Sequence, residues 1–154
     1  MDRVQTLRLE HRHIEDLADH LRQVVDAELP LDPLALLRLR RSFGQALARH
    51  LNKEDWLIYP RLKASREPAL RALGARLYDE IGALQDAFSA YGRRWTSAAI
   101  AADWIGFRKD THGILQALRR RIALEEDELY PVLERHFEET ATAGQPVPRL
   151  ARGA

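Results

Sequence analysis

Four side chains that can bind a metal ion interrupt the hydrophobic pattern of the chain: His11, His50, Glu54 and Glu125. Each stands where an apolar residue would continue the inner stripe of a predicted helix. Imidazole and carboxylate groups that face the inside of a helical bundle are suitable ligands for iron or manganese. Buried carboxylates without partners are costly, so the set favours a metal site. The alternative left open is a core of hydrogen-bonded histidines and salt-bridged glutamates.

Two more polar residues, Tyr78 and Arg121, are predicted to face inward beside this set. Arg121 precedes Glu125 by four residues, so the two side chains share one helix face. A guanidinium stays protonated and has no lone pair to offer, which excludes Arg121 as a ligand. Tyr78 could bind iron as a phenolate, or it could hydrogen-bond a carboxylate as a buried tyrosine commonly does.

The elements that must position these residues are four long segments with the period of an amphipathic helix. They cover residues 2–28, 33–63, 68–95 and a last stretch that starts between 98 and 103 and ends near 139. Asp2 and Asp32 are expected N-caps, and Pro33 and Pro68 are expected in first turns. Short connectors between long helices predict an all-α fold, an antiparallel up-down-up-down four-helix bundle.

Distances along the helices place the inward-facing polar residues in one layer. His11 lies as far before the end of the first helix as His50 lies after the start of the second, roughly 25 Å at the rise of an α-helix. The same reasoning from the other helix ends brings Glu54, Tyr78 and Arg121 to matching heights. This agreement supports a single site to which all four helices contribute.

The chain also contains an internal repeat. One motif recurs at an interval of 71 positions: His50-x-x-x-Glu54 with Tyr59-Pro60, and Arg121-x-x-x-Glu125 with Tyr130-Pro131. The repeat predicts two helical hairpins that are related by a pseudo-two-fold axis. The two prolines are expected near the ends of the second and fourth helices, where each should cause a kink or a break.

These segments resemble the hemerythrin-like (HHE cation-binding) family over about residues 5–137. The residues that carry the resemblance are Glu10-His11-Arg12-His13-Ile14, His50-x-x-x-Glu54-Asp55-x-x-x-Tyr59-Pro60, Tyr78-x-x-Ile81 and Glu125-Glu126-x-x-Leu129-Tyr130-Pro131. The resemblance implies a four-helix bundle around a non-haem di-iron centre. Such a centre binds dioxygen, or senses oxygen, nitric oxide, iron or redox state.

The ligand pattern of that family is only partly present. By the resemblance, the four residues of the predicted site are metal ligands, whereas Tyr78 and Arg121 stand where the family has histidine. The two missing histidines serve the same metal in the family, so one half-site is damaged and the other is retained. We therefore expect Arg121 to replace the second metal and to hold both glutamates by charge-assisted hydrogen bonds. The expected cofactor is one ion of iron or else manganese, and the open alternative is no metal.

The other histidines are expected outside the site. His13 and His20 are predicted to be solvated, although a slip in the register of the first helix would make His13 a ligand in place of His11. His112 faces away from Arg121, and His136 lies too far along its helix.

Five residues near the motifs are given structural roles. Trp56, Trp95 and Trp104 are predicted to pack against other side chains. Asp55 and Glu126, which directly follow the two inner glutamates, are predicted to form charge pairs on the helix surface.

Composition narrows the class of protein. The 154 residues include no cysteine, which excludes disulfides, iron–sulfur clusters and thiolate ligands. A formal net charge of +1 gives no reason to expect a nucleic acid or an anionic membrane as a partner. No apolar run reaches the length of a membrane span and no signal peptide is seen, so a cytoplasmic protein is expected. We predict one domain over residues 1–139 and a disordered tail over residues 140–154.

Three functional hypotheses follow. The leading one is a small non-enzymatic metal-binding protein that senses or buffers dioxygen, nitric oxide, redox state or iron; reversible dioxygen carriage is disfavoured because it uses two irons. The second is a metal-free regulatory bundle that acts through a protein partner or a homodimer face. The third is an enzyme in which one iron with an open position activates peroxide or dioxygen.

Overall fold

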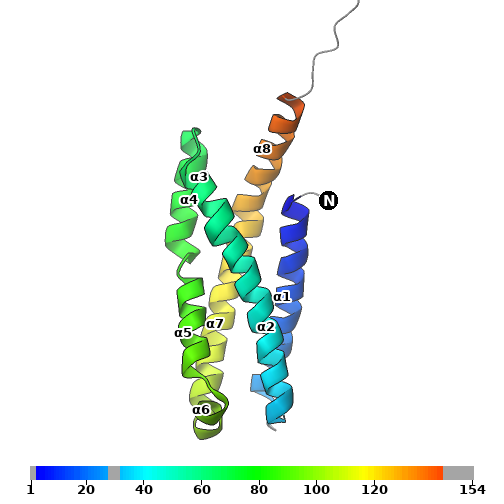
Figure 1. Cartoon of the computed structure of the whole chain (residues 1–154), viewed down its shortest axis with the longest axis vertical. Helices are drawn as coiled ribbons and strands as arrows, with labels where there is room; N and C mark the ends of the chain where they lie inside the picture. Colours follow the sequence, from blue (N-terminus) through cyan, green and yellow to red (C-terminus); the bar gives the residue numbers. More distant parts are fainter. Residues whose placement is uncertain (1–2, 28–31, 144–154) are drawn as a thin grey trace, which may run out of the picture.

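The structure, a computed structural model, describes residues 3–27 and 32–143. The helices form rods that run lengthwise through the molecule, and consecutive rods are antiparallel (Figure 1). In chain order, the elements are α1 (Arg3–Asp26), α2 (Pro33–Lys53), η1 (Glu54–Ile58), α3 (Tyr59–Lys63), α4 (Pro68–Ile81), α5 (Leu84–Arg94), α6 (Ser97–Ala102), α7 (Trp104–Leu124), η2 (Glu125–Leu129) and α8 (Tyr130–Ala143). The prediction of an all-α up-down-up-down bundle is confirmed.

Capping residues explain where three of the helices begin. The side chain of Asp32 accepts a hydrogen bond from the backbone N–H of Ala35 at 3.0 Å, and Pro33 opens α2 as predicted. Thr96 caps α6 and Asp103 caps α7 in the same way. The predicted cap Asp2 lies outside the described residues.

The third rod (α4 and α5) and the fourth rod (α7, η2 and α8) differ from the prediction in their continuity. The segment 68–95 was expected to form one helix, but the α-helix ends at Ile81 and resumes at Leu84. Gly82 lies in this interruption, and glycine favours a helix less than any residue except proline. The fourth rod is preceded by the separate short helix α6, where a connector was expected.

The rods that contain Pro60 and Pro131 continue through the proline. Each holds one π-helical turn, η1 or η2, directly before the Tyr-Pro pair. In η1 the backbone N–H of Tyr59 donates to the carbonyl of Glu54, five residues back. In a regular α-helix the ring of Pro60 would collide with the carbonyl of Trp56, and the wider turn accommodates it. The expected kink or break near a helix end is therefore replaced by a π-helical turn inside a longer rod.

The extra residue in η1 changes which side chains face inward. Leu57 was predicted to continue the inner stripe after Glu54, but it is 52% exposed, and Tyr59 is buried instead. Trp56 was predicted to pack and is 73% exposed. Trp95 is buried and Trp104 is partly buried, in agreement with their predicted packing role.

The hydrophobic core consists of two clusters, and the polar residues of α1 lie between them. Within α1, Val4 and Leu7 belong to one cluster, whereas the buried apolar residues from Ile14 to Val25 belong to the other. His11 falls between the two along α1 and is buried. The bundle therefore holds a polar layer within an apolar interior, as the helix heights predicted.

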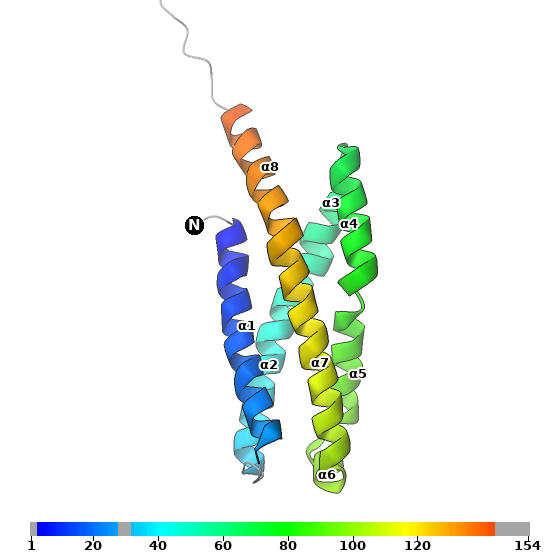
Figure 2. The same cartoon turned by 180° about the vertical axis from the view of Figure 1, so that it is seen from behind.

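The rods pack closely enough to enclose that layer. Seen from behind, α7 and α8 form one continuous rod beside α1 (Figure 2).

Helix α8 continues to Ala143, so the first residues of the predicted tail, 140–143, are helical. Residues 144–154 of that tail lie outside the described part of the chain. Within residues 3–27 and 32–143, no helix is both long enough and apolar enough to cross a membrane.

Candidate metal centre

The four predicted ligands converge from four elements. His11 of α1, His50 of α2, Glu54 of η1 and Glu125 of η2 each offer one ligand atom, and these atoms lie within 4.8 Å of one another. All four side chains are buried, with exposed fractions of 2% or less. Imidazole nitrogens and carboxylate oxygens at this spacing form a donor set that suits a divalent transition-metal ion.

Both histidines are oriented by a carboxylate behind the ring. Nδ1 of His11 lies 2.8 Å from Oε1 of Glu126, and Nδ1 of His50 lies 3.0 Å from Oε2 of Glu10. Glu10 also accepts a hydrogen bond from Lys53. A carboxylate on Nδ1 fixes the ring and leaves Nε2 to face a metal, which is the usual outer support of histidine ligands. Glu10 and Glu126 are thus part of the candidate site. Glu126 also forms a charge pair of the predicted kind, with Arg8.

Two buried atoms of the candidate ligands have no hydrogen-bond partner. These are Nε2 of His50 and Oε2 of Glu125. Nε2 of His50 lies 3.3 Å from Oε2 of Glu54, and Nε2 of His11 lies 3.4 Å from Oε2 of Glu125, so the four groups crowd round one point. Buried polar atoms are almost always paired, and a metal ion would satisfy both orphaned atoms at once. The residues present therefore fit a metal ion.

Arg121 is buried inside the same layer and binds three carboxylates. Its Nε donates to Oε1 of Glu125 at 2.8 Å, and its Nη2 donates to Oε2 of Glu54 at 3.1 Å. These are the two hydrogen bonds that the sequence predicted. Nη2 also donates to Oδ1 of Asp55 at 2.7 Å, although Asp55 was expected on the helix surface. The remaining nitrogen, Nη1, is buried without a partner.

Asp55 and Glu126 occupy equivalent places in the internal repeat, each directly after an inner glutamate. Both turn inward, one to Arg121 and the other to His11. Their shared position in the repeat is a sequence signal that could have identified them as a pair. It was obscured because α-helical periodicity places the residue after an inward-facing one at the side of the helix.

Two tyrosines donate across the layer in a reciprocal pattern. The hydroxyl of Tyr59 donates to Oε1 of Glu125 at 3.0 Å, and the hydroxyl of Tyr130 donates to Oε1 of Glu54 at 2.7 Å. Each tyrosine therefore contacts the glutamate of the other half of the repeat. Burial and the neighbouring carboxylates raise the pKa of both phenols well above the usual range, so both remain donors.

Tyr78 does not take part in this layer of hydrogen bonds. Its ring packs edge-on against Tyr59 with a centroid distance of 5.5 Å, and Nζ of Lys63 lies 3.6 Å from the centre of its ring. No hydrogen bond joins its hydroxyl to either carboxylate among the residues that the structure describes. The predicted role as a carboxylate donor belongs to Tyr59 and Tyr130 instead, because the π-helical turns bring those residues inward.

The pKa values of the two buried glutamates in the layer are shifted in opposite directions. Burial opposes ionisation of Glu54, but the close contact with His50 and the charges of His50 and Arg121 hold the pKa of Glu54 well below its usual range. Burial and the charge of Glu54 raise the pKa of Glu125 to about 7. Burial lowers the pKa of His50, but its hydrogen bond with Glu10 and the nearby charge of Glu54 outweigh this and raise it to about 9. Without a metal, protons therefore remain on part of the ligand set.

The remaining histidines lie outside the layer. His13 and His20 are exposed, so His11 rather than His13 points into the bundle. Nε2 of His112 lies 2.8 Å from Asp26 on the surface, and His136 lies 3.5 Å from Glu67. These positions agree with the sequence prediction for all four residues.

Comparison with known proteins adds one finding. The model of a protein family, the hemerythrin HHE cation-binding domain, matches residues 2–133. The comparisons with curated proteins and with solved structures gave no match.

Proposed function

The chain belongs to the hemerythrin HHE cation-binding domain family, and on that premise we propose that it binds a single metal ion and senses or buffers a small molecule or the ion itself. The ion is iron or, as the alternative, manganese. The ligands are His11, His50, Glu54 and Glu125. The single observation that carries the proposal is the pair of orphaned ligand atoms, Nε2 of His50 and Oε2 of Glu125, buried in the middle of this set.

The position of Arg121 supports one ion rather than two. Its guanidinium lies between the two glutamates, where it donates to both. A fixed positive charge beside the carboxylates repels a second cation. Asp55 then neutralises Arg121, so that both glutamates can still compensate a divalent ion. One guanidinium, one divalent ion and the carboxylates of Asp55, Glu54 and Glu125 together carry no net charge.

When bound, the ion would supply a coordination position for a small ligand such as dioxygen or nitric oxide. The protein contributes the surroundings of that position. Tyr130 holds Glu54 by a hydrogen bond, and Glu10 and Glu126 hold the histidine rings. Nη1 of Arg121 is a buried donor without a partner, so one hydrogen-bond donor remains in the layer for a polar ligand. This arrangement suits retention of a small polar molecule more than turnover of an organic substrate.

Metal content and ligand substitution test this proposal. We expect about one ion of iron or manganese per chain after anaerobic loading of the purified protein, measured by elemental analysis after desalting. The His50→Ala variant should lose most of the ion, because the substitution removes a ligand. It also leaves Glu10 with Lys53 as its remaining partner. His13→Ala is the matched control, since it removes an exposed imidazole from α1, and it should retain the ion. Retention of neither iron nor manganese by the unaltered protein contradicts the proposal.

A second candidate, a metal-free regulatory bundle, is favoured by one observation. The layer compensates its own charges without a metal: Arg121 and His50 carry positive charge, Asp55 and Glu54 carry negative charge, and the raised pKa of Glu125 favours its neutral form. In this case the bundle would act through a protein partner or a homodimer face. Arg121→His separates the two candidates. Increased metal uptake by this variant supports the metal protein, and no uptake by either form supports the regulatory bundle.

A further inference from the structure

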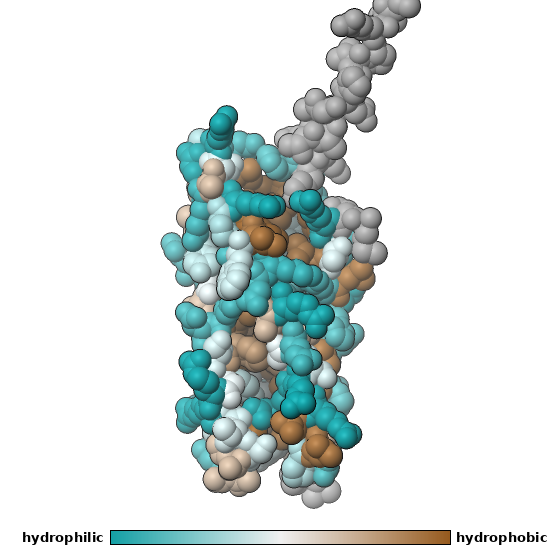
Figure 3. Space-filling model, in the orientation of Figure 1, coloured by the Kyte–Doolittle hydropathy of each residue, from teal (hydrophilic) through white to brown (hydrophobic). Residues whose placement is uncertain are grey.

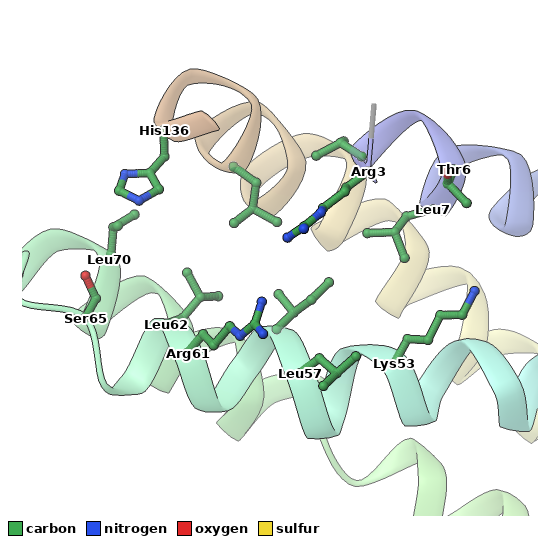
Figure 4. Close-up of a pocket in the computed structure, with 13 residues that line it drawn as sticks. Arg3, Thr6, Leu7, Lys53, Leu57, Arg61, Leu62, Ser65, Leu70 and His136 are labelled. Carbon is green, nitrogen blue, oxygen red and sulfur yellow. The ribbon is translucent and has the colours of Figure 1, made fainter. Parts of the chain in front are cut away.

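A pocket separate from the metal layer opens near the end of the bundle at which α1 begins. Its volume is about 720 Å³, which is within the range of sites that hold one small organic molecule. It lies between the start of α1, the η1–α3 segment, the start of α4 and α8 (Figure 4). No function is assigned to this pocket by the family or by the proposed metal site.

The walls of the pocket are mainly aliphatic. They are formed by Val4, Leu7, Leu57, Ile58, Leu62, Leu70 and Leu133. Leu57 contributes because the π-helical turn η1 moves it out of the bundle core, and its side chain remains half exposed. Figure 3 shows hydrophobic side chains in the upper half of this face, bordered by hydrophilic ones. Such walls would stabilise a hydrocarbon chain, because its burial removes apolar surface from water.

Among the residues that the structure describes, the ionisable side chains that line the pocket are all basic. Arg3, Arg61, Lys53 and His136 line it, together with Thr6 and Ser65. Lys53 is paired with Glu10, whereas Arg3 and Arg61 form no ion pair with another residue in the described part of the chain. Their guanidinium groups turn toward each other across the pocket (Figure 4). Two like charges that face one cavity repel each other, and an anion placed between them would reverse this interaction.

We propose that this pocket binds a fatty acid, a single-chain amphiphile with a carboxylate head. The carboxylate lies between Arg3 and Arg61, which can each offer a fork of two N–H donors. The hydrocarbon chain lies along the leucine walls. The chain's own C-terminal residues 144–154 are a poor alternative occupant, because they contain Arg149 and Arg152 and no acidic side chain.

Calorimetric titration with dodecanoate below its micelle concentration tests the proposal on the full chain, both metal-loaded and metal-free. We expect saturable binding of one molecule per chain in both forms, so the result does not depend on the metal site. Acetate lacks the hydrocarbon chain and dodecyltrimethylammonium carries the opposite charge, and neither should bind measurably. The double variant Arg3→Gln/Arg61→Gln should weaken dodecanoate binding by at least about tenfold, since two charge-assisted hydrogen-bond partners are lost.

Matched variants keep the test decisive. Arg38→Gln/Arg41→Gln makes the same change of charge at two exposed residues of α2 that do not line the pocket, and it should leave binding unchanged. Leu57→Gln alters an exposed wall residue and should weaken dodecanoate binding while the fold, followed by circular dichroism, is retained. The proposal is overturned if the unaltered protein shows no saturable binding of dodecanoate. It is equally overturned if the arginine variant binds as tightly, or if only dodecyl phosphate binds.

Discussion

Arg121 occupies, in the second half of the internal repeat, the place that His50 occupies in the first. Each lies four residues before a buried glutamate on the same helix face. Nε2 of His50 is 3.3 Å from Oε2 of Glu54, and Nε of Arg121 is 2.8 Å from Oε1 of Glu125. The imidazole of His50, a group that can bind a metal, thus has as its counterpart in the repeat the guanidinium of Arg121, which carries a positive charge of its own. This exchange explains why one layer of the bundle combines a candidate ligand set with a buried ion-pair network.

Restoring histidine should restore a second binding position. We expect Tyr78→His/Arg121→His to bind more metal than the unaltered protein, toward two ions per chain, because Asp55 and both glutamates lose their guanidinium partner. Elemental analysis after identical loading measures this. Arg119→His is the control, as it introduces a histidine at an exposed position of α7. An unchanged metal content in the double variant would show that Arg121 does not limit the site.

Asp55 should matter for the metal although it is not a proposed ligand. Asp55→Asn removes the carboxylate that neutralises Arg121, so the guanidinium would draw more strongly on Glu54 and Glu125. We expect metal affinity to fall by about tenfold or more, in line with the usual effect of altering groups that support ligands. Competition with a chelator gives the dissociation constant. Asp127→Asn, an exposed acid on η2, should leave that constant unchanged.

Much of the candidate site could be predicted from the sequence because its candidate ligands interrupt regular stripes. His11, His50, Glu54 and Glu125 stand at core positions of an α-helical pattern, and the pattern holds up to each of them. The inner stripe fails just after Glu54, whereas Leu129, which was predicted to continue it after Glu125, is buried. The π-helical turn η1 adds a residue and rotates the side chains that follow, so Leu57 was expected inside and lies outside.

The hydrogen-bond partners of the candidate ligands were harder to predict than the candidate ligands themselves. Glu10 meets His50, and Glu126 meets His11, across helix pairs. Such contacts depend on the relative height and rotation of two rods to within a few ångströms, which periodicity does not specify. The interruption at Gly82 was missed for a related reason. A single glycine is tolerated in many helices, and the surrounding packing decides whether the helix continues there.

The reciprocal tyrosines should stabilise the metal-free bundle. Tyr59→Phe and Tyr130→Phe each leave a buried carboxylate oxygen with one hydrogen bond fewer. We expect each to lower the free energy of unfolding by about 1–3 kcal/mol. Urea denaturation measures the change. Tyr78→Phe is the matched control, since its hydroxyl has no hydrogen bond among the described residues, and the loss should stay within about 0.5 kcal/mol. Equal losses in all three variants would contradict the assignment.

Metal binding should strengthen as the pH rises. The pKa of His50 is raised to about 9 and that of Glu125 to about 7, so near neutral pH the metal-free layer retains protons that a metal must displace. Both groups have pKa values above their usual ones, so proton competition is strongest below pH 7 and ends above pH 9. Apparent dissociation constants, measured against a chelator of known pH dependence, should therefore decrease from pH 6 to pH 9 by about tenfold per displaced proton per pH unit. An affinity that does not change over this range would show that neither group gives up a proton to the ion.

Anomalous diffraction from crystals of the metal-loaded protein tests the central claim most directly. Data at the iron or manganese edge should show one peak per chain, bonded to Nε2 of His11 and of His50, with the guanidinium of Arg121 beside it between Glu54 and Glu125. Two peaks between the helices, or a single peak with Arg121 turned out to solvent, would contradict the claim that this guanidinium stands in place of a second metal ion.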